Sequence, residues 1–326
     1  MNVPLLEIEH LVTRFYTEEG VVKAVDGNFL HLAEGETLGI VGESGSGKTV
    51  TALSVMRLIE NPGRIESGRI LFRGEDLLAN SEKKMRQIRG KDIAMVFQDS
   101  LSSLNPTLTI GEQVDRVIRF HTKLTRRRRK SRVVELLTQV GIPEPKKRTG
   151  NYPHEFSGGM RQRALIAMAI SCNPAVLILD EPTTALDVTI EAQIFELVDQ
   201  LKERFGMGTV LITHDLAVVA NSCNRVTIMY AGRIVEEAGV YALYENPLHP
   251  YTRGLLHSIP HLNEEGQERL PSIPGEVPDL ISLPEGCNFS PRCRYADERC
   301  RQVAPSLKEV KSGRKIACLK IDEIDE

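Results

Sequence analysis

The sequence predicts an α/β protein with a parallel sheet and a region of antiparallel strands, and three observations support that prediction. Apolar runs at residues 38–41, 176–179 and 209–212 have the composition of buried strands, and helical stretches lie between them. Residues 1–37 alternate apolar and polar positions, which is typical of antiparallel strands. Each apolar run is followed within two residues by glycine, an acid or histidine. Sites of parallel sheets lie at such carboxyl ends of strands.

The remaining elements follow in chain order. We expect further strands at residues 68–72 and 93–97, and helices at residues 49–58, 158–170 and 190–204. From about residue 110 to residue 150 the pattern becomes helical and basic, with five consecutive cations at residues 126–130. Such a run usually forms a solvated face or turn, and contact with anionic headgroups or an acidic partner loop is the alternative.

Directly after the first buried strand, residues 42–49 spell Gly-Glu-Ser-Gly-Ser-Gly-Lys-Thr, which fits the P-loop pattern G-x-x-x-x-G-K-[ST]. Glycines let the backbone wrap round phosphates, and the amides at the next helix N-terminus attract anions. Lys48 should reach the β- and γ-phosphates of a nucleotide, and the Thr49 hydroxyl should bind Mg²⁺. The nucleotide-binding residues expected here are Gly42, Ser44, Gly45, Ser46, Gly47, Lys48, Thr49 and Val50.

A second specific element begins the helix expected at residues 158–170. Ser157 is followed by Gly158, Gly159 and Met160, so that a hydroxyl and bare amides are exposed at a helix start. The P-loop already serves the nucleotide from one side. We therefore expect this loop to meet the γ-phosphate of a nucleotide on another subunit, and an ordinary helix cap is the alternative.

Two adjacent carboxylates end the buried strand at residues 176–180. Asp180 suits the outer shell of Mg²⁺, and Glu181 should lie beside the γ-phosphate and polarise the attacking water. The alternative role for such a pair is a helix N-cap at a strand end. The P-loop upstream favours the catalytic interpretation.

Charge and hydropathy exclude several classes. The net charge of −3 gives no general argument for nucleic-acid binding. No apolar run reaches the roughly 18 residues that a bilayer span requires. The N-terminal segment lacks the basic and apolar pattern of a signal peptide, so we expect a cytosolic protein with peripheral membrane contact at most.

The composition changes near residue 240, where prolines become frequent and periodicity is lost. We expect residues 1–240 to form one domain, with a helical subdomain at about residues 100–172. Residues 241–326 should form a Pro-rich linker and a small Cys-rich domain.

Four of the six cysteines, Cys287, Cys293, Cys300 and Cys318, lie within the last 40 residues. In a reducing cytosol such a group is more often a metal site than a set of disulfides. The spacing contains no tight zinc-type pair and fits an iron–sulfur cluster better, with zinc and a metal-free group as alternatives. Cys172 and Cys223 lie in apolar contexts and are expected in the core.

The order of these motifs resembles the nucleotide-binding subunit of an ABC transporter over about residues 1–240. The fold that this resemblance implies is a P-loop NTPase cassette with a mixed sheet core, an antiparallel β subdomain and a helical subdomain. The resemblance implies ATP as substrate and identifies Gln98 as the glutamine that ligates Mg²⁺ and senses the membrane subunits. Residues 157–160 match the signature loop, with Phe156 and Met160 departing from the commonest sequence, Leu-Ser-Gly-Gly-Gln. Residues 184–187, with Asp187 at their end, resemble the loop that crosses the dimer interface.

Two further roles come from the same resemblance. His214 matches the histidine that contacts the γ-phosphate. An aromatic side chain near residue 15 should stack on adenine, and Phe15 has the better offset from Leu11, with Tyr16 as its rival.

Three segments resemble the dipeptide/oligopeptide and nickel importer branch of that family: the P-loop, residues 246–256 and residues 286–293. This resemblance implies an ATPase that powers peptide import from the cytoplasmic face of the membrane. It also implies membrane permease subunits as partners, a second ATPase subunit in a heterodimer or homodimer, and a [4Fe–4S] cluster on the four C-terminal cysteines.

Two rival functions belong to other classes. A soluble ABC ATPase acting on nucleic acid or ribosomes commonly has two cassettes or long coiled-coil insertions, and this chain has neither. A metal-sensing module with a vestigial ATPase would not need the complete set of catalytic residues.

Overall fold

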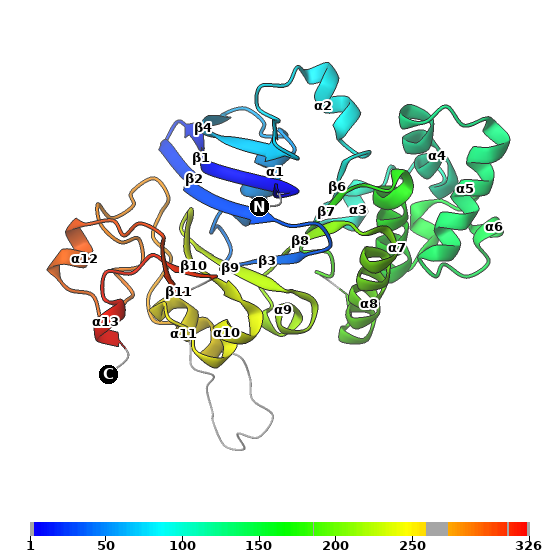
Figure 1. Cartoon of the computed structure of the whole chain (residues 1–326). Coiled ribbons are helices and arrows are strands. Elements are labelled where there is room, and N and C mark those ends of the chain that lie inside the picture. The colour runs from blue at the N-terminus through cyan, green and yellow to red at the C-terminus, as the bar shows by residue number, and fades with distance from the viewer. Residues whose placement is uncertain (1–2, 185, 259–272, 312, 325–326) are drawn as a thin grey trace. The chain divides into compact units, whose positions relative to one another are not determined.

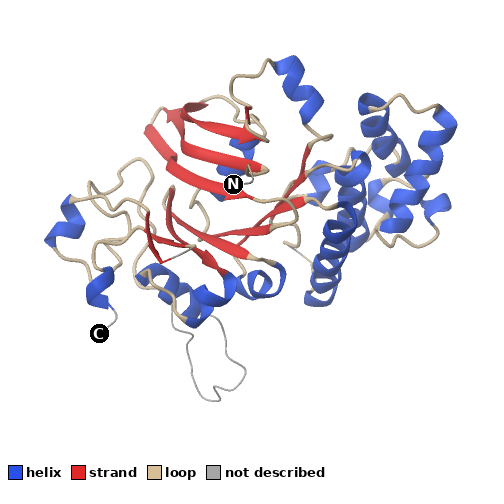
Figure 2. Cartoon of the chain, in the orientation of Figure 1, coloured by secondary structure: helices blue, strands red, loops and turns tan. Residues whose placement is uncertain are grey.

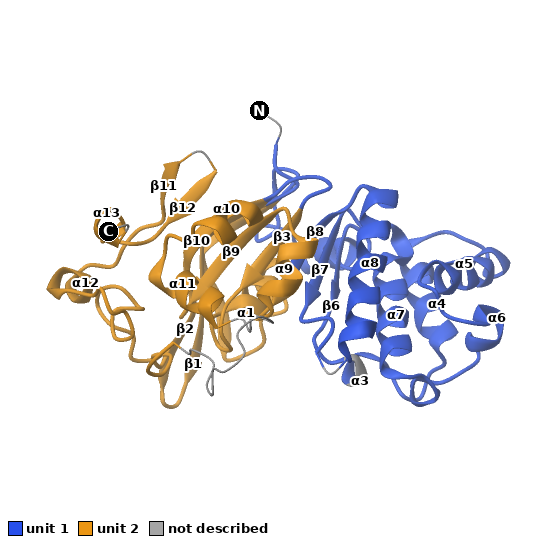
Figure 3. Cartoon of the chain, turned by 90° about the horizontal axis from the view of Figure 1, so that it is seen from below, with its two compact units in different colours: residues 1–6, 32–36, 72–211 blue, residues 7–31, 37–71, 212–326 orange. Residues whose placement is uncertain are grey.

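The computed structural model describes residues 3–184, 186–258, 273–311 and 313–324. The chain forms two compact units, coloured separately in Figure 3. Unit 1 consists of residues 1–6, 32–36 and 72–211, and unit 2 of residues 7–31, 37–71 and 212–326. Figure 2 shows the helices and strands of the chain. Among the described residues, no helix has the length and apolar character needed to cross a bilayer.

Unit 2 contains a sheet that starts with two long strands, β1 (Leu6–Thr17) and β2 (Gly20–Leu32), joined by a two-residue turn (Figure 1). So short a connection makes the two strands antiparallel. β4 (Gly63–Phe72) is the other neighbour of β1. Buried positions recur along β1, with a change of phase at His10, whose φ is +48°. The antiparallel strands predicted for residues 1–37 are confirmed.

The second sheet of unit 2 is mixed. β3 (Thr37–Val41) pairs in parallel with β9 (Arg225–Tyr230), and β10 (Arg233–Gly239) pairs with β9 in the antiparallel sense. β12 (Arg314–Ile316) and then β11 (Lys308–Lys311) continue the sheet by antiparallel pairing. The helices of this unit are α1 (Lys48–Val55), α9 (Leu216–Ser222), α10 (Val240–Glu245), α11 (Pro250–His257), α12 (Glu298–Gln302) and α13 (Ile321–Ile324).

In unit 1, β6 (Ile93–Val96) pairs in parallel with β7 (Val176–Asp180). β8 (Gly208–Thr213), which begins in this unit, is the other neighbour of β7. Every residue of β7 and β8 is buried, which explains why these strands are continuous apolar runs in the sequence. The other elements are β5 (Glu75–Asp76), α2 (Glu82–Ile88), α3 (Ser100–Ser103), α4 (Ile110–His121), α5 (Arg126–Gln139), α6 (Pro145–Arg148), η1 (Pro153–Glu155), α7 (Gly158–Ala169), η2 (Ile170–Cys172) and α8 (Val188–Phe205).

The C-terminal segment, by which we mean the described residues from 241 onward, packs into unit 2. β12 lengthens the sheet of β9 and β10, and Phe289 lies in the same hydrophobic cluster as residues of those strands. The Phe289 ring centroid is 5.1 Å from that of Tyr230 and 5.4 Å from that of Tyr251. A separate small Cys-rich domain is therefore not supported, because this segment shares its core with the strands before it.

Phe289 should be important for stability because its side chain is only 3% exposed and packs against both the Tyr230 and the Tyr251 ring. We predict that Phe289→Ala lowers the free energy of unfolding by about 3–5 kcal/mol, since it leaves a cavity in this cluster. Urea unfolding monitored by tyrosine fluorescence measures the change. A shift below about 1 kcal/mol would show that the C-terminal segment contributes little to the core of unit 2.

Candidate nucleotide-binding site

The P-loop lies in unit 2, between β3 and α1, where the sequence predicts it. A Cβ at position 42 would lie 2.2 Å from the carbonyl oxygen of Met229, and one at position 47 would lie 2.2 Å from that of Ala24. Gly47 is also the N-cap of α1, with φ of +101°. Only glycine fits at both positions, so the close approach of neighbouring backbone fixes the path of the loop.

Lys48 is buried, and its Nζ donates hydrogen bonds to the carbonyl oxygens of Gly42 at 2.7 Å and Glu43 at 3.1 Å. The ammonium is therefore held over the loop. The Ser46 hydroxyl oxygen is buried and has no hydrogen-bond partner within the described parts of the chain. A phosphate oxygen would satisfy such an orphaned hydroxyl, so the loop fits a nucleotide phosphate.

In unit 1, β7 ends at Asp180, which is buried, and Glu181 follows with φ of +44°. The Gln98 side-chain amide donates to a Glu181 carboxylate oxygen at 3.0 Å, although the two residues are 83 positions apart. The Thr184 hydroxyl donates to the same oxygen at 3.2 Å. The sequence singled out Gln98 and Glu181 separately, and the structure brings them together after β6 and β7.

The predicted signature loop also lies in unit 1. Ser157 caps α7, and its hydroxyl accepts a hydrogen bond from the Met160 N–H at 3.3 Å. A Cβ on Gly159 would lie 2.7 Å from Ile190 on α8, so the small residues allow α7 and α8 to approach each other. Asp187 caps α8 by accepting from the Ile190 N–H at 3.0 Å. Ala185, in the predicted interface loop, lies outside the described residues.

The remaining predicted residues belong to unit 2. His214 follows β8 and is exposed. Phe15 lies against Gly63, since a Cβ there would be 2.6 Å from its ring. Tyr16 is 42% exposed and donates a hydrogen bond to Glu66. The guanidinium carbon of Arg64 lies over the Tyr16 ring, 5.3 Å from its centroid. Which aromatic side chain meets adenine stays a prediction.

Sequence reasoning missed one ion pair at the P-loop. Arg292 donates to both carboxylate oxygens of Glu43, at 2.7 and 3.2 Å, and its side chain is only 5% exposed. The Glu43 N–H donates to the hydroxyl of Tyr251 at 3.0 Å. Since Arg292 is 249 residues from Glu43, no local pattern signals the pair. The P-loop is thus anchored by two residues of the C-terminal segment.

The prediction of a [4Fe–4S] cluster, with zinc as its alternative, is wrong. Among the described residues, no group of three or more His, Cys, Asp and Glu side chains can hold a metal ion. Cys287, Cys293, Cys300 and Cys318 line a cavity of only about 20 Å³, room for about one water molecule. Burial raises the pKa of each of these thiols above 9.0. Uneven spacing in the sequence gave no information about this burial.

Family models match two parts of the chain: ABC transporter at residues 25–184, and oligopeptide/dipeptide transporter, C-terminal region, at residues 235–300. Among solved structures, the dimeric bacterial ABC transporter cassette MJ0796 has a TM-score of 0.65 at 27% identity, covering 72% of this chain and 98% of that one. The cbiO1 protein of Clostridium perfringens has a TM-score of 0.63 at 27% identity, covering 74% and 91%. The fold and the site therefore define an ATP-binding cassette of the ABC transporter class.

Relatives match almost the whole chain. The probable peptide ABC transporter ATP-binding protein y4tR of Sinorhizobium fredii is 49% identical over 98% of this chain and 96% of its own length. The dipeptide transport ATP-binding protein DppD of Haemophilus influenzae is 49% identical, over 96% and 94%. The oligopeptide transport ATP-binding protein OppD of Bacillus subtilis is 53% identical, over 90% and 82%. The chain belongs to the ATP-binding proteins of peptide ABC transporters.

These matches confirm the family predicted from the motifs. Proteins of this family hydrolyse ATP to power transport, and this chain is such an ATPase. The alternative of an ABC ATPase that acts on nucleic acid or ribosomes is not supported.

The partly buried thiols of Cys287 and Cys318 predict a pH dependence of stability. Burial raises the pKa of Cys287 and Cys318 to about 11 from 9.0, so the folded chain retains protons that the unfolded chain releases. Stability should therefore be complete below about pH 9 and fall as the pH rises toward 11, by about 1–2 kcal/mol per thiol near pH 10.5. Thermal unfolding between pH 8 and about 10.5 measures this fall. The variant Cys287→Ser/Cys318→Ser should show a shallower slope, and an unchanged slope would contradict the assignment.

Proposed function

We propose that this chain is the nucleotide-binding subunit of an ABC importer of dipeptides or oligopeptides, bound peripherally at the cytoplasmic face of the membrane. The observation that carries the proposal is the P-loop, where glycine-only contacts, the held Lys48 ammonium and the orphaned Ser46 hydroxyl fit a nucleotide phosphate. The peptide substrate follows from the names of the relatives and from the match of the C-terminal region to the oligopeptide/dipeptide transporter family.

Each predicted site residue receives a role in this proposal. Lys48 and the P-loop amides hold the β- and γ-phosphates, and the hydroxyl of Thr49, with Gln98 and Asp180, would hold Mg²⁺, which neutralises phosphate charge when bound. Glu181 accepts the proton of the attacking water, and its bond from Gln98 orients the carboxylate toward that task. His214 contacts the γ-phosphate. The bonds from Lys48 to the loop carbonyls must be exchanged for phosphate contacts on binding.

We propose that two subunits complete each site head to tail. Ser157, Gly158, Gly159 and Met160 of one subunit would approach the nucleotide held by the P-loop of the other, and Asp187 would lie at the interface. The MJ0796 cassette is dimeric, which supports the presence of two subunits. The second subunit is a related ATPase or a second copy of this chain, and both bind membrane permease subunits.

For adenine, exposure favours Tyr16 over Phe15. Tyr16 is 42% exposed, whereas the ring of Phe15 covers Gly63.

The division of the chain into two functional regions also remains part of the proposal. Residues 1–240 would form the cassette, with a helical subdomain at about residues 100–172, and residues 241–326 would form a functional C-terminal region. The match of the oligopeptide/dipeptide C-terminal model to residues 235–300 supports that second region.

The role of Glu181 is tested by Glu181→Gln. The amide keeps the shape of the side chain but cannot accept the proton, so ATP should bind normally while turnover falls by about 10²-fold or more. Equilibrium ATP binding and steady-state phosphate release, both with the permease subunits present, measure the two effects. Near-normal turnover would remove Glu181 from the role of base.

The contact between Arg292 and Glu43 predicts a positioning role for the C-terminal segment. Arg292→Ala removes a bidentate, buried partner of the P-loop, so about 1–2 kcal/mol of loop order is lost and KM for ATP should rise about tenfold. The value of kcat should change less, and Arg292→Lys should restore part of the loss through a single contact.

The matched control is Arg301→Ala, an exposed arginine of the same segment whose nearest carboxylate oxygen, on Glu298, is 3.9 Å away. The control should keep the parent KM. If Arg292→Ala also keeps it, the ion pair serves folding alone.

A further inference from the structure

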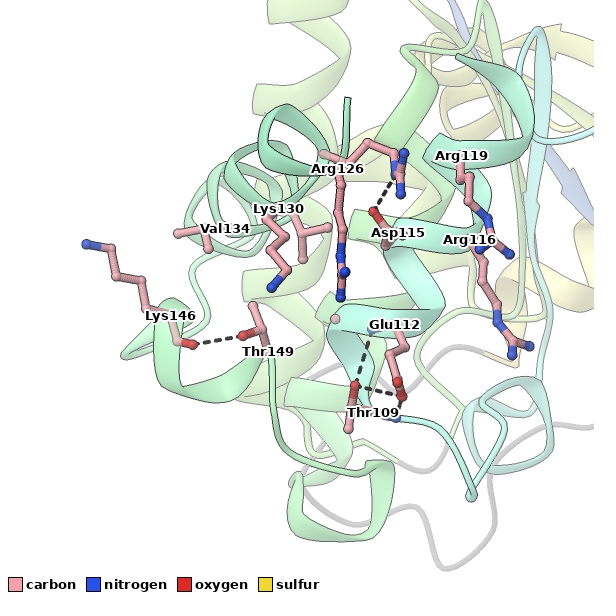
Figure 4. Close-up of a pocket in the computed structure, with 13 residues that line it drawn as sticks. Thr109, Glu112, Asp115, Arg116, Arg119, Arg126, Lys130, Val134, Lys146 and Thr149 are labelled. Carbon is pink, nitrogen blue, oxygen red and sulfur yellow. Dashed lines mark hydrogen bonds and ion pairs between the residues drawn. The ribbon is translucent and has the colours of Figure 1, made fainter. Parts of the chain in front are cut away.

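Unit 1 contains a cavity that shares no residue with the predicted nucleotide site. It has a volume of about 750 Å³ and is lined from α4, α5 and α6 (Figure 4). Arg126 and Lys130 extend from α5 toward Thr149 and Glu112 in this view. The lining carries two acidic and six basic side chains, a net charge of +4, the basic ones being Arg116, Arg119, Arg126, Arg129, Lys130 and Lys146.

Both acids of the cavity are engaged by other groups. Glu112 accepts hydrogen bonds from the backbone N–H and the hydroxyl of Thr109, at 3.0 and 3.1 Å, in the capping box of α4. Asp115 pairs with Arg129 at 2.7 Å. Within the described ranges, no carboxylate is close enough to form an ion pair with Arg119, Arg126 or Lys130. The cavity therefore keeps uncompensated positive charge.

The walls of the cavity are fixed in place. The Gly111 N–H donates to the Thr149 carbonyl at 3.0 Å, and a Cβ on Gly111 would lie 2.6 Å from that oxygen, so α4 and the end of α6 cannot separate without losing this contact. Arg129 joins α5 to α4 through Asp115 and also donates to the Leu124 carbonyl at 3.0 Å. The like charges are thus held near one another by contacts that do not depend on a ligand.

The start of α5 is electrostatically unfavourable by itself. Arg126 and Lys130 are four positions apart on one face of the helix, where like charges destabilise it. The first turn contains no acid, and cations there oppose the helix dipole. A bound anion would offset both the repulsion between these like charges and their unfavourable interaction with the helix dipole. Arg127 and Arg128, on other faces of the same turn, do not line the cavity.

We propose that this cavity binds a phosphate anion, either a free polyphosphate or the headgroup of an acidic phospholipid. Arginine guanidinium groups match phosphate oxygens in paired hydrogen bonds. The volume is within the range of small-molecule sites, and the apolar side chains in the lining, Val133 and Val134, are few. The ligand is therefore recognised by its charge and phosphate oxygens.

The experiment compares two double variants that remove equal charge from the same helix. Arg126→Gln/Lys130→Gln alters the cavity, and Arg127→Gln/Arg128→Gln alters neighbouring positions outside it. All chains carry Lys48→Ala, which weakens binding of the probe at the P-loop. Calorimetric titration with tripolyphosphate at about 0.15 M salt tests the free anion. Flotation with phosphatidylglycerol vesicles, with phosphatidylcholine as the blank, tests the headgroup. Thermal unfolding of each chain checks its fold.

The cavity pair should weaken binding by about tenfold or more, because two charge-assisted contacts are lost, while the neighbouring pair should match the parent. If the cavity pair binds tripolyphosphate more weakly than the neighbouring pair does, the ligand is a free phosphate anion. If the cavity pair is weaker only in binding phosphatidylglycerol vesicles, the ligand is a lipid headgroup. Equal losses in the two pairs, or no binding of either probe to the parent, would overturn the site. The cavity pair should unfold at no lower temperature than the parent, since it loses like-charge repulsion.

Discussion

The close approach of two backbone carbonyls to the P-loop is the constraint on which the site depends. The oxygens of Met229 and Ala24 occupy the space that a Cβ at positions 42 and 47 would need. The loop must therefore follow one path, which points Lys48 back over its own carbonyls and leaves the Ser46 hydroxyl buried without a partner. A nucleotide phosphate supplies what this arrangement lacks, so the fit to ATP follows from packing as well as from the motif.

The same loop joins the cassette to the C-terminal segment. Arg292 and Tyr251 both bind Glu43, and Phe289 packs against the rings of Tyr230 and Tyr251. Asn288 adds a hydrogen bond to the Ala231 carbonyl at 2.9 Å. Residues far apart in the chain therefore share one core beside the phosphate site. A segment that looks like an appendage in the sequence is, in physical terms, part of the support of the P-loop.

The sequence predicted the features that have a local signal. Continuous apolar runs identified β3, β7 and β8, because buried parallel strands have no polar face. Strand ends located Asp180 and Glu181, and the resemblance to the ABC family located Gln98. The pair of Arg292 and Glu43 has no local signal, since tertiary packing alone brings it together. The prediction from the four C-terminal cysteines was wrong because their spacing in the sequence does not report how small the cavity around them is.

The most direct test of the account is ATP turnover by the chain reconstituted with its permease subunits in lipid vesicles, with and without peptide. The account predicts Mg²⁺-dependent turnover that rises when peptide is supplied for transport. Turnover that is absent, or that responds to RNA or DNA and not to peptide, would contradict it.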